Sequence, residues 1–427
     1  MQVVYSLLYS LLWWLAMPLV LARLWWRGRR EPGYRQHWGE RLGRYHLAAA
    51  DAGVPTLWIH AVSVGETRAA QPLIDALLKQ HPAHRIVLTH MTPTGRGTGA
   101  ALFEHYGARL VQRYLPYDLG PMLRGFLRAY QPLACILIET EVWPNLVAQC
   151  RAQAIPVMLV NARLSARSLA RGLRMQGFLG TAARGLTATA AQTPADAARL
   201  RQMGADPVTV TGSIKFDVLP PPDQLAQGQA WRSQFGNRAV LLCASTRDGE
   251  EEMILAALQA VPLDALLVIV PRHPQRFDAV AGLIGAHGLR LARRSTMGAA
   301  PVAPSVQVVL GDSMGELFAY YAAADLAFIG GSLLPLGGQN LIEACAVGTP
   351  VMIGPSSFNF AAVTEDALAT GAALRIDDAP ALLATAQALL SDAAVRGAMA
   401  GAARTFAAQH RGATGRTVAM LAPLLVQ

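Results

Sequence analysis

Lysine, cysteine and charge of either sign are scarce in this 427-residue sequence. Two of its 37 basic residues are lysines, Lys79 and Lys215, and charged residues make up 15% of the chain. The four cysteines are scattered without a CxxC spacing, so nothing indicates a disulfide framework or a cysteine-based zinc site, and a reducing compartment is favoured. Because 52% of the residues are hydrophobic, a largely disordered chain is excluded.

Several ligand-binding motifs are also absent. The sequence has no HExxH motif and no DxD-type acidic pair that would hold a divalent ion against a pyrophosphate, so we expect no metal and no cofactor. It also lacks the GxGxxG dinucleotide fingerprint and the GxxxxGK[ST] phosphate loop. These absences argue against a nicotinamide-dependent enzyme and against a P-loop ATPase.

The formal net charge of +9 indicates an anionic partner. Such a balance suits nucleic acid, an anionic membrane surface or a phosphorylated substrate. The arginines are not interleaved with aromatic side chains, and no nucleic-acid-binding motif is present. A basic, membrane-tethered nucleic-acid-binding protein is therefore the disfavoured alternative, and we expect no nucleic-acid partner.

The first 45 residues have the composition of a membrane anchor. Twenty residues from Val3 to Ala22 carry no charge, and as a helix they would span about 30 Å, the thickness of the hydrocarbon core. Positive charge follows this run instead of preceding it, which argues against a signal peptide and predicts that the catalytic domains lie on the cytoplasmic face of the inner membrane. The arginines that follow are Arg23, Arg27, Arg29, Arg30, Arg35, Arg41 and Arg44. We predict one anchor over residues 1–26, with a helix in the membrane interface as the alternative.

Past residue 54, short apolar runs alternate with amphipathic stretches, which indicates strand–helix units and parallel sheets. The strands expected are residues 56–62, 84–91, 108–116, 133–139, 155–161, 186–192 and 207–212, then 238–245, 265–271, 289–295, 306–312, 326–331 and 350–355. The predicted layout is a first domain over 27–217, a Pro-rich linker over 218–229, a second domain over 230–405 and a helical tail over 406–427. We expect two Rossmann-like α/β domains facing a central cleft, which resembles the GT-B architecture of glycosyltransferases, together with an N-terminal membrane-anchor helix.

In parallel sheets, ligands bind beyond the carboxyl ends of the strands, so the loops there are the candidate sites. After the first expected strand, residues 60–67 read HAVSVGET. Glu66 lies at the expected start of a helix, where the dipole favours its ionised form, and an ionised Glu66 can take a proton from an attacking hydroxyl. The alternative is a capping box with Ser63, in which Glu66 only caps the helix.

Two later loops of the first half carry charge. Glu139 and Glu141 follow an apolar strand beside Trp143, where they can hold hydroxyls or a cation, although a solvated helix start is the alternative. Arg163 follows the next strand, and its planar fork suits a carboxylate or a phosphate.

The second half has its own candidate loops. Arg272 and His273 lie between two prolines, so their turn is stiff. Residues 311–317, GDSMGEL, offer backbone N–H groups at a helix start, which is an anion site. Residues 330–344 are rich in glycine, which lets the backbone approach a phosphate, and Glu343 can accept hydrogen bonds from a ribose.

In their order along the chain, these loops resemble the Kdo transferase family, which moves 3-deoxy-D-manno-octulosonic acid (Kdo) from CMP-Kdo to lipid A precursors. The resemblance runs from the N-terminal anchor to about residue 362. It rests on HAVSVGE, ETEVWPN, NARLS, GSIKFD, ASxxxGEE, PRHPxRF, GDxMGEL and GGSLLPLGGQN.

The resemblance implies roles for individual residues. Glu66 matches the catalytic base of an inverting displacement. The residues implied in binding the CMP moiety are Arg272, His273, Ser313, Met314, Gly315, Glu316, Gln339, Asn340 and Glu343. Those implied on the acceptor and Kdo side are Ser63, Gly65, Glu139, Glu141, Arg163 and Lys215. Gln339 departs from the His of many members and cannot become a cation.

The reaction implied is a metal-independent transfer of Kdo to the lipid A precursor lipid IVA in lipopolysaccharide core biosynthesis. Glu66 would activate a glucosamine 6-hydroxyl, while the arginines of residues 23–44 would lie against anionic lipid and the phosphates of the acceptor. The alternative enzyme is a GT-B glycosyltransferase that uses a UDP-sugar donor on another membrane lipid.

Overall fold

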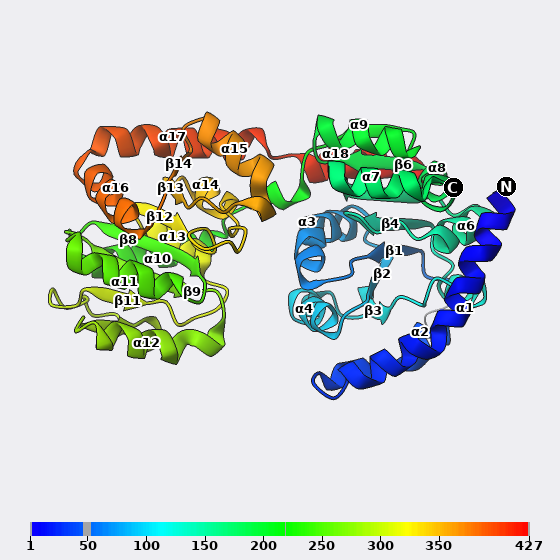
Figure 1. Cartoon of the computed structure of the whole chain (residues 1–427), viewed down its shortest axis with the longest axis horizontal. Helices are drawn as coiled ribbons and strands as arrows, with labels where there is room; N and C mark the ends of the chain where they lie inside the picture. Colours follow the sequence, from blue (N-terminus) through cyan, green and yellow to red (C-terminus); the bar gives the residue numbers. More distant parts are fainter. Residues whose placement is uncertain (1, 46–52, 218, 426–427) are drawn as a thin grey trace. The chain divides into compact units, whose positions relative to one another are not determined.

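The computed structural model describes residues 2–45, 53–217 and 219–425. The chain forms two compact units, the first made of Met1–Asp217 and His410–Gln427 and the second of Val218–Gln409. Each unit is a seven-stranded parallel sheet flanked by helices (Figure 1).

In the first unit the strand order is β3-β2-β1-β4-β5-β6-β7. The strands are β1 (Thr56–His60), β2 (Arg85–His90), β3 (Leu110–Tyr114), β4 (Ala134–Ile138), β5 (Val157–Ala162), β6 (Ala188–Ala191) and β7 (Val208–Val210). The longer helices that follow them are α3 (Val64–Gln80), α4 (Pro93–Phe103), α5 (Gly120–Tyr130), α6 (Pro144–Ala152), α7 (Ala166–Arg174), α8 (Gln176–Arg184) and α9 (Pro194–Met203). Helices cover both faces of this sheet, because Trp58 packs in one hydrophobic cluster while its neighbours Leu57 and Ile59 pack in another.

In the second unit the strand order is β10-β11-β9-β8-β12-β13-β14. The strands are β8 (Val240–Thr246), β9 (Leu266–Pro271), β10 (Leu291–Arg293), β11 (Val308–Leu310), β12 (Leu326–Ile329), β13 (Val351–Ile353) and β14 (Ala373–Arg375). The helices are α10 (Pro222–Phe235), α11 (Glu250–Ala260), α12 (Phe277–Ala286), α13 (Leu317–Ala323), α14 (Ile342–Val347), α15 (Ala361–Ala369), α16 (Ala379–Ser391) and α17 (Ala393–Gln409). Each strand expected from the sequence is present. The edge strand β14 was not expected, since it is three residues long and two of them are exposed.

The structure corrects two predicted boundaries. Most of the expected linker 218–229 is helical, because prolines open α10 and Gly228 lets it pack closely on α13: an added Cβ would lie 2.4 Å from the carbonyl oxygen of Ala319. The expected tail 406–427 is divided between the units. Helix α17 ends the second unit, and α18 (Ala413–Leu425) joins the first, where the Asp217 carboxylate accepts hydrogen bonds from the backbone N–H groups of Gly412 and Thr414. Residues 1, 218 and 426–427 of these predicted segments lie outside the described residues.

The N-terminal helix α1 (Gln2–Arg27) belongs to the first unit. By length and composition alone, its residues Leu7–Arg27 could cross a membrane. A short connection follows, made of η1 (Pro32–Arg35) and α2 (Trp38–Arg41).

Candidate functional site

The candidate loops after β1, β4 and β12 lie where the strand order of each sheet reverses. In the first unit the chain departs in opposite directions from β1 and β4, and in the second unit from β8 and β12. A parallel α/β sheet binds ligands at this point, beyond the carboxyl ends of its strands. Glu66 follows β1, Glu139 and Glu141 follow β4, and the glycine-rich loop follows β12.

Glu66 caps helix α3 and also has the properties of a base. Its Oε2 atom accepts hydrogen bonds from the backbone N–H of Ser63 at 3.1 Å and of Val62 at 2.5 Å. Among the described residues no hydrogen bond engages Oε1, and the side chain is half-buried. Burial, together with the charges of Glu141 and Glu139, raises the pKa of Glu66 to about 7, although the two backbone hydrogen bonds act in the opposite direction. The capping and base interpretations are therefore compatible.

Glu139 is held between two cations. Its backbone adopts the left-handed region with φ 65°, and its side chain is buried. The carboxylate lies 2.5 Å from the Lys215 Nζ and accepts a hydrogen bond from the Arg163 Nε at 3.1 Å. Since both oxygens are engaged, Glu139 anchors the two cations, of which Arg163 is half-exposed and Lys215 is about one-third exposed.

Glu141 completes the acidic group of this unit. The Trp143 indole N–H donates to its Oε2 at 3.0 Å. Burial raises the pKa of Glu141, and Glu139 adds to the rise. The structure thus brings Glu66, Glu139 and Glu141 close enough for their charges to interact, with Ser63 and Gly65 at the turn into α3.

Asn161, the first residue of the NARLS motif, is a positioning residue whose role the sequence analysis does not assign. It is buried at the end of β5 with φ 55°, a conformation that asparagine tolerates better than most residues. Its Oδ1 accepts hydrogen bonds from the Ser213 hydroxyl at 3.1 Å and from the Ile214 N–H at 3.2 Å. Asn161 thereby holds the turn that carries Lys215. An asparagine at the end of an apolar strand is the sequence feature that marks this position. Its hydrogen-bond partners Ser213 and Ile214 cannot be predicted because they are distant in sequence.

In the second unit, the β9 and β12 loops meet through Arg272 and Gln339. The Arg272 Nε donates to the Gln339 Oε1 at 3.2 Å, so the glutamine orients the guanidinium. Burial lowers the pKa of His273, and the nearby charges of Arg247, Arg272 and Arg276 lower it further. A neutral histidine beside arginines suits an anionic ligand. Farther along the loop, the Asn340 side-chain amide donates to Glu343 at 3.2 Å.

Glu250, in the ASxxxGEE motif, is a second residue whose role the sequence analysis does not assign. Its fully buried carboxylate accepts hydrogen bonds from the N–H groups of Gly331 at 2.6 Å, Ser332 at 2.9 Å and Leu333 at 3.0 Å. These N–H groups of the glycine-rich loop are therefore engaged within the protein. These three N–H groups are not available to a phosphate, contrary to the expectation for the glycine-rich loop.

The residues from Ser313 to Glu316 form a separate turn after β11. The Ser313 and Tyr320 hydroxyls are hydrogen-bonded at 2.8 Å, and Glu316 accepts a hydrogen bond from Arg294 at 2.9 Å. Met314 is exposed, and Gly315 has φ 80°, which favours glycine. The structure places these residues at the same edge of the sheet as the Arg272 loop, since β11 pairs with β9.

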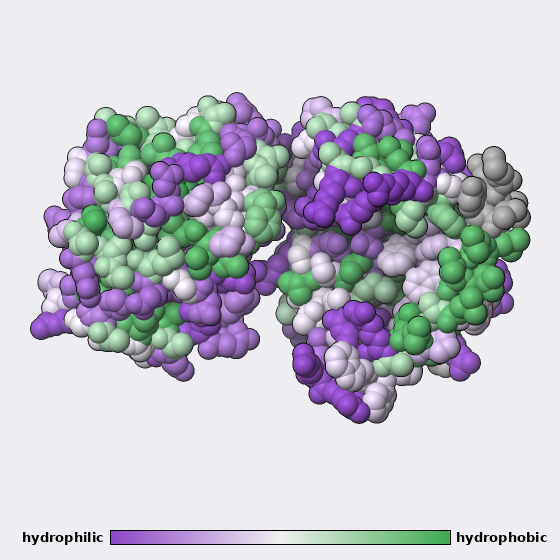
Figure 2. All heavy atoms as spheres, viewed as in Figure 1, coloured by the Kyte–Doolittle hydropathy of each residue, from purple (hydrophilic) through white to green (hydrophobic). Residues whose placement is uncertain are grey.

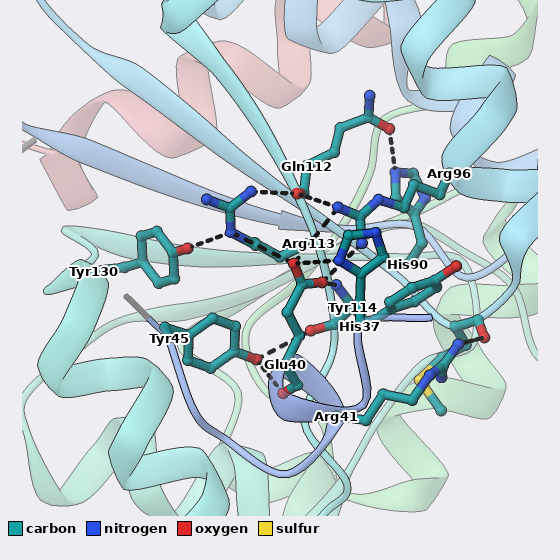
Figure 3. Close-up of polar contacts among 11 residues, drawn as sticks. His37, Glu40, Arg41, Tyr45, His90, Arg96, Gln112, Arg113, Tyr114 and Tyr130 are labelled. Carbon is teal, nitrogen blue, oxygen red and sulfur yellow. Dashed lines mark hydrogen bonds and ion pairs between the residues drawn. The ribbon is translucent and has the colours of Figure 1, made fainter. Parts of the chain in front are cut away.

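A cluster around Glu40 fastens the segment before β1 to the sheet edge (Figure 3). Its carboxylate accepts hydrogen bonds from Arg96 and from the Tyr114 N–H, each at 2.8 Å. The neighbouring Arg41 is buried, donates to the Met91 carbonyl at 3.1 Å and lies over the Tyr114 ring. This corrects the expectation that the whole arginine run of residues 23–44 lies against lipid.

Among residues 2–45, 53–217 and 219–425, the structure contains no group of three or more His, Cys, Asp and Glu side chains that could hold a metal ion.

Comparison with known proteins gives consistent matches. Residues 36–218 match the family model described as 3-Deoxy-D-manno-octulosonic-acid transferase (kdotransferase). A 3-deoxy-D-manno-octulosonic acid transferase of Bordetella pertussis is 48% identical over 414 residues, which cover 94% of this chain and 95% of the relative. The enzyme of the same name from Haemophilus influenzae is 36% identical over 424 residues, or 98% of each chain.

Solved structures with a similar fold include a glycosyltransferase from Rickettsia africae, with 13% identity and a TM-score of 0.58 over 88% of this chain and 100% of that one. HepE from Anabaena, solved in complex with UDP, has 13% identity and a TM-score of 0.58 over 86% of this chain and 99% of that one. At such identity the likeness concerns the fold alone, and it confirms the expected GT-B class.

Proposed function

The chain belongs to the Kdo transferase family of glycosyltransferases, and from this premise we propose that it transfers Kdo from CMP-Kdo to lipid IVA, with Glu66 as the general base. The observation that carries the proposal is the group of acids and cations at the ends of β1, β4 and β5, in which the pKa of Glu66 is raised to about 7. A carboxyl group with this pKa accepts and releases a proton at the pH of the cytoplasm.

In the proposed reaction, Glu66 removes the proton from a glucosamine 6-hydroxyl of the acceptor. The hydroxyl oxygen attacks the anomeric carbon of Kdo as the bond from that carbon to the CMP phosphate oxygen breaks, which inverts the configuration. CMP leaves with the electron pair, and the proton remains on Glu66 until water removes it. The backbone bonds from Val62 and Ser63 hold Oε2, which leaves Oε1 for the hydroxyl.

Cationic side chains support an anionic donor. CMP-Kdo carries a phosphate and a carboxylate, and arginine can bind the paired oxygens of either group through two parallel hydrogen bonds. Arg272, oriented by Gln339, is assigned to the CMP moiety, with His273, Asn340 and Glu343 on neighbouring parts of the same loops. Ser313 to Glu316 complete the proposed nucleotide site.

The test is CMP release from CMP-Kdo in the presence of lipid IVA by the wild type and by Glu66→Gln. We expect turnover to fall by about 100-fold or more in the variant while CMP binding, measured by calorimetry, is unchanged. Glu104→Gln is the matched control, because Glu104 is an exposed carboxylate of the same unit.

Three results would contradict parts of the proposal. Full activity of Glu66→Gln would remove Glu66 as the base. A folded wild type that binds CMP without acceptor-dependent turnover would remove lipid IVA as the acceptor. Binding of UDP in preference to CMP would favour the alternative of a UDP-sugar donor.

A further inference from the structure

One stripe of helix α1 packs against the first unit along most of its length. The Ser10 hydroxyl and the Asn145 side chain are hydrogen-bonded, with the Asn145 Nδ2 donating to the Ser10 Oγ at 3.1 Å. The Trp13 ring centre lies 5.9 Å from that of Tyr117, and Met17 is buried beside the same tyrosine. These contacts recur at intervals of three or four residues, so one face of the helix faces protein.

The partners of this stripe combine an apolar cluster around Tyr117 and Leu119 with polar groups of the neighbouring helices. Asn145 lies in the first turn of α6 and is itself held by Asp118, whose carboxylate accepts a hydrogen bond from the Asn145 N–H at 3.1 Å. Helix α8 also contacts α1, and exposed arginines close both helices, Arg151 in α6 and Arg184 in α8. If α1 crossed a bilayer in this docked position, the polar and charged groups of α6 and α8 would enter the hydrocarbon, which is strongly unfavourable.

The opposite face of α1 is apolar and open. Leu15 is 67% exposed and Leu19 is 74% exposed, and both belong to a run of exposed apolar side chains, which is typical of a protein or membrane interaction site. The other large exposed side chains of this face and its margins are Leu7, Leu8, Leu11, Leu12 and Trp14. Figure 2 shows the resulting hydrophobic surface where α1 runs along the first unit in Figure 1.

The carboxyl end of α1 is basic. A cavity of about 620 Å³ there is lined by Arg23, Trp26, Arg27, Arg29, Arg30, Glu31 and Tyr34. Arg29 and Arg35 each stack on the exposed Trp25 ring, at 4.7 and 4.8 Å from its centre. Tryptophan and arginine at one end of an apolar helix face match the headgroup region of an anionic bilayer in polarity and charge.

We propose that α1 lies in the plane of the membrane while docked on the first unit, with its leucine face among the upper acyl chains and its terminal arginines on lipid phosphates. Both ends of the helix are then on the cytoplasmic side, and no segment of α1 crosses the bilayer. Asn145 belongs to the segment that carries Glu139 and Glu141, so the docked helix sets the depth of these carboxylates relative to the lipid surface. This in-plane attachment of α1 does not depend on which sugar the protein transfers.

The test determines the side of the membrane on which the N-terminus lies. A short tag with one cysteine is placed ahead of Met1 of the full chain, and a membrane-impermeant maleimide is added to spheroplasts or to inverted inner-membrane vesicles. The four native cysteines are buried and remain unlabelled in the folded protein. We expect no labelling of the tag in spheroplasts. Ala394→Cys, an exposed position in the second unit, is the control for sidedness.

Labelling of the tag in spheroplasts that leave Ala394→Cys unlabelled would overturn the proposal, because the N-terminus would then lie outside. A second measurement tests docking itself. Oxidation of Ser10→Cys/Asn145→Cys in native membranes is expected to form an intramolecular disulfide, whereas Ser10→Cys alone forms none because the native cysteines are buried. A disulfide that forms in detergent but not in membranes would show that α1 leaves the first unit in the bilayer, which would also overturn the proposal.

Discussion

At the residue scale, three buried or half-buried glutamates have different surroundings and therefore different roles. Glu139 is neutralised by Arg163 and Lys215 and holds these cations in place. Glu250 is surrounded by backbone N–H groups and organises a loop. Glu66 has a raised pKa and one free oxygen, which are the properties a base requires.

The raised pKa of Glu66 predicts the pH dependence of the reaction. A base acts in its deprotonated form, so kcat/KM is expected to rise with pH, to reach half its plateau near pH 7 and to level off above it. The measurement is CMP release between pH 5.5 and about 9, with CMP-Kdo generated in place and a blank without enzyme at each pH. A rate that is constant across this range would contradict the assignment.

Glu141 is expected to tune that midpoint. Glu141→Gln removes a negative charge that raises the pKa of Glu66, so the half-maximal rate should move to lower pH while the plateau is retained in part. Glu104 is exposed and distant in sequence from this acidic group, so Glu104→Gln should leave the midpoint of the pH profile unchanged. A midpoint that stays in place in Glu141→Gln would indicate that another group controls the profile.

At the element scale, the loops after β8 and β12 are joined by one carboxylate at the start of α11. Glu250 reaches across the reversal point of the second sheet to three consecutive N–H groups of the β12 loop. Gly331, with φ 70°, belongs to the same loop as Gln339, which accepts the hydrogen bond from Arg272. By holding this loop, Glu250 also determines where Gln339 lies.

Glu250→Gln is therefore expected to destabilise the second unit and to weaken CMP binding. The amide keeps the shape but replaces an acceptor oxygen with a donor facing buried N–H groups, at a cost of roughly 2 to 4 kcal/mol in the free energy of unfolding. Urea unfolding and CMP calorimetry provide the measurements. Glu252→Gln is the matched control, since Glu252 is half-exposed on the same helix and lies 3.3 Å from the His287 Nε2. Equal stability of the two variants would contradict the role of Glu250.

At the scale of the whole molecule, the chain leaves the first unit at Asp217 and returns to it after Gln409. Helix α18 contributes Val418 and Leu421 to the same hydrophobic cluster as Leu73 of α3. The carboxyl terminus is thus part of the first unit, although it is separated from it in sequence by the whole of the second.

A chain that ends at Gln409 is expected to have a destabilised first unit and an unchanged second unit. Loss of Val418 and Leu421 removes about 3 to 6 kcal/mol of burial energy. Hydrogen exchange followed by mass spectrometry should show faster exchange in β1, β4 and β5 and unaltered exchange in β8, β9 and β12. Faster exchange confined to the second unit would contradict the assignment of α18.

The sequence by itself determined the fold class and the candidate loops. Buried parallel strands require short apolar runs, so every strand but the exposed edge strand β14 could be read from composition. Loops at strand ends follow from the same pattern, which is why Glu66, Glu139 and Arg272 were selected. The order of the motifs along the chain then indicated the family that the relatives confirm.

Only the tertiary structure decided which of these groups meet. The pairing of Glu139 with Lys215 and the support of their turn by Asn161 join segments that are distant in sequence. Likewise, neither the burial of Arg41 nor the docked position of α1 follows from composition, because an apolar helix of this length fits a spanning and an in-plane position equally well. Whether a side chain is buried or ion-paired depends on residues that are distant in sequence and close only in the folded structure. The local sequence therefore does not predict it.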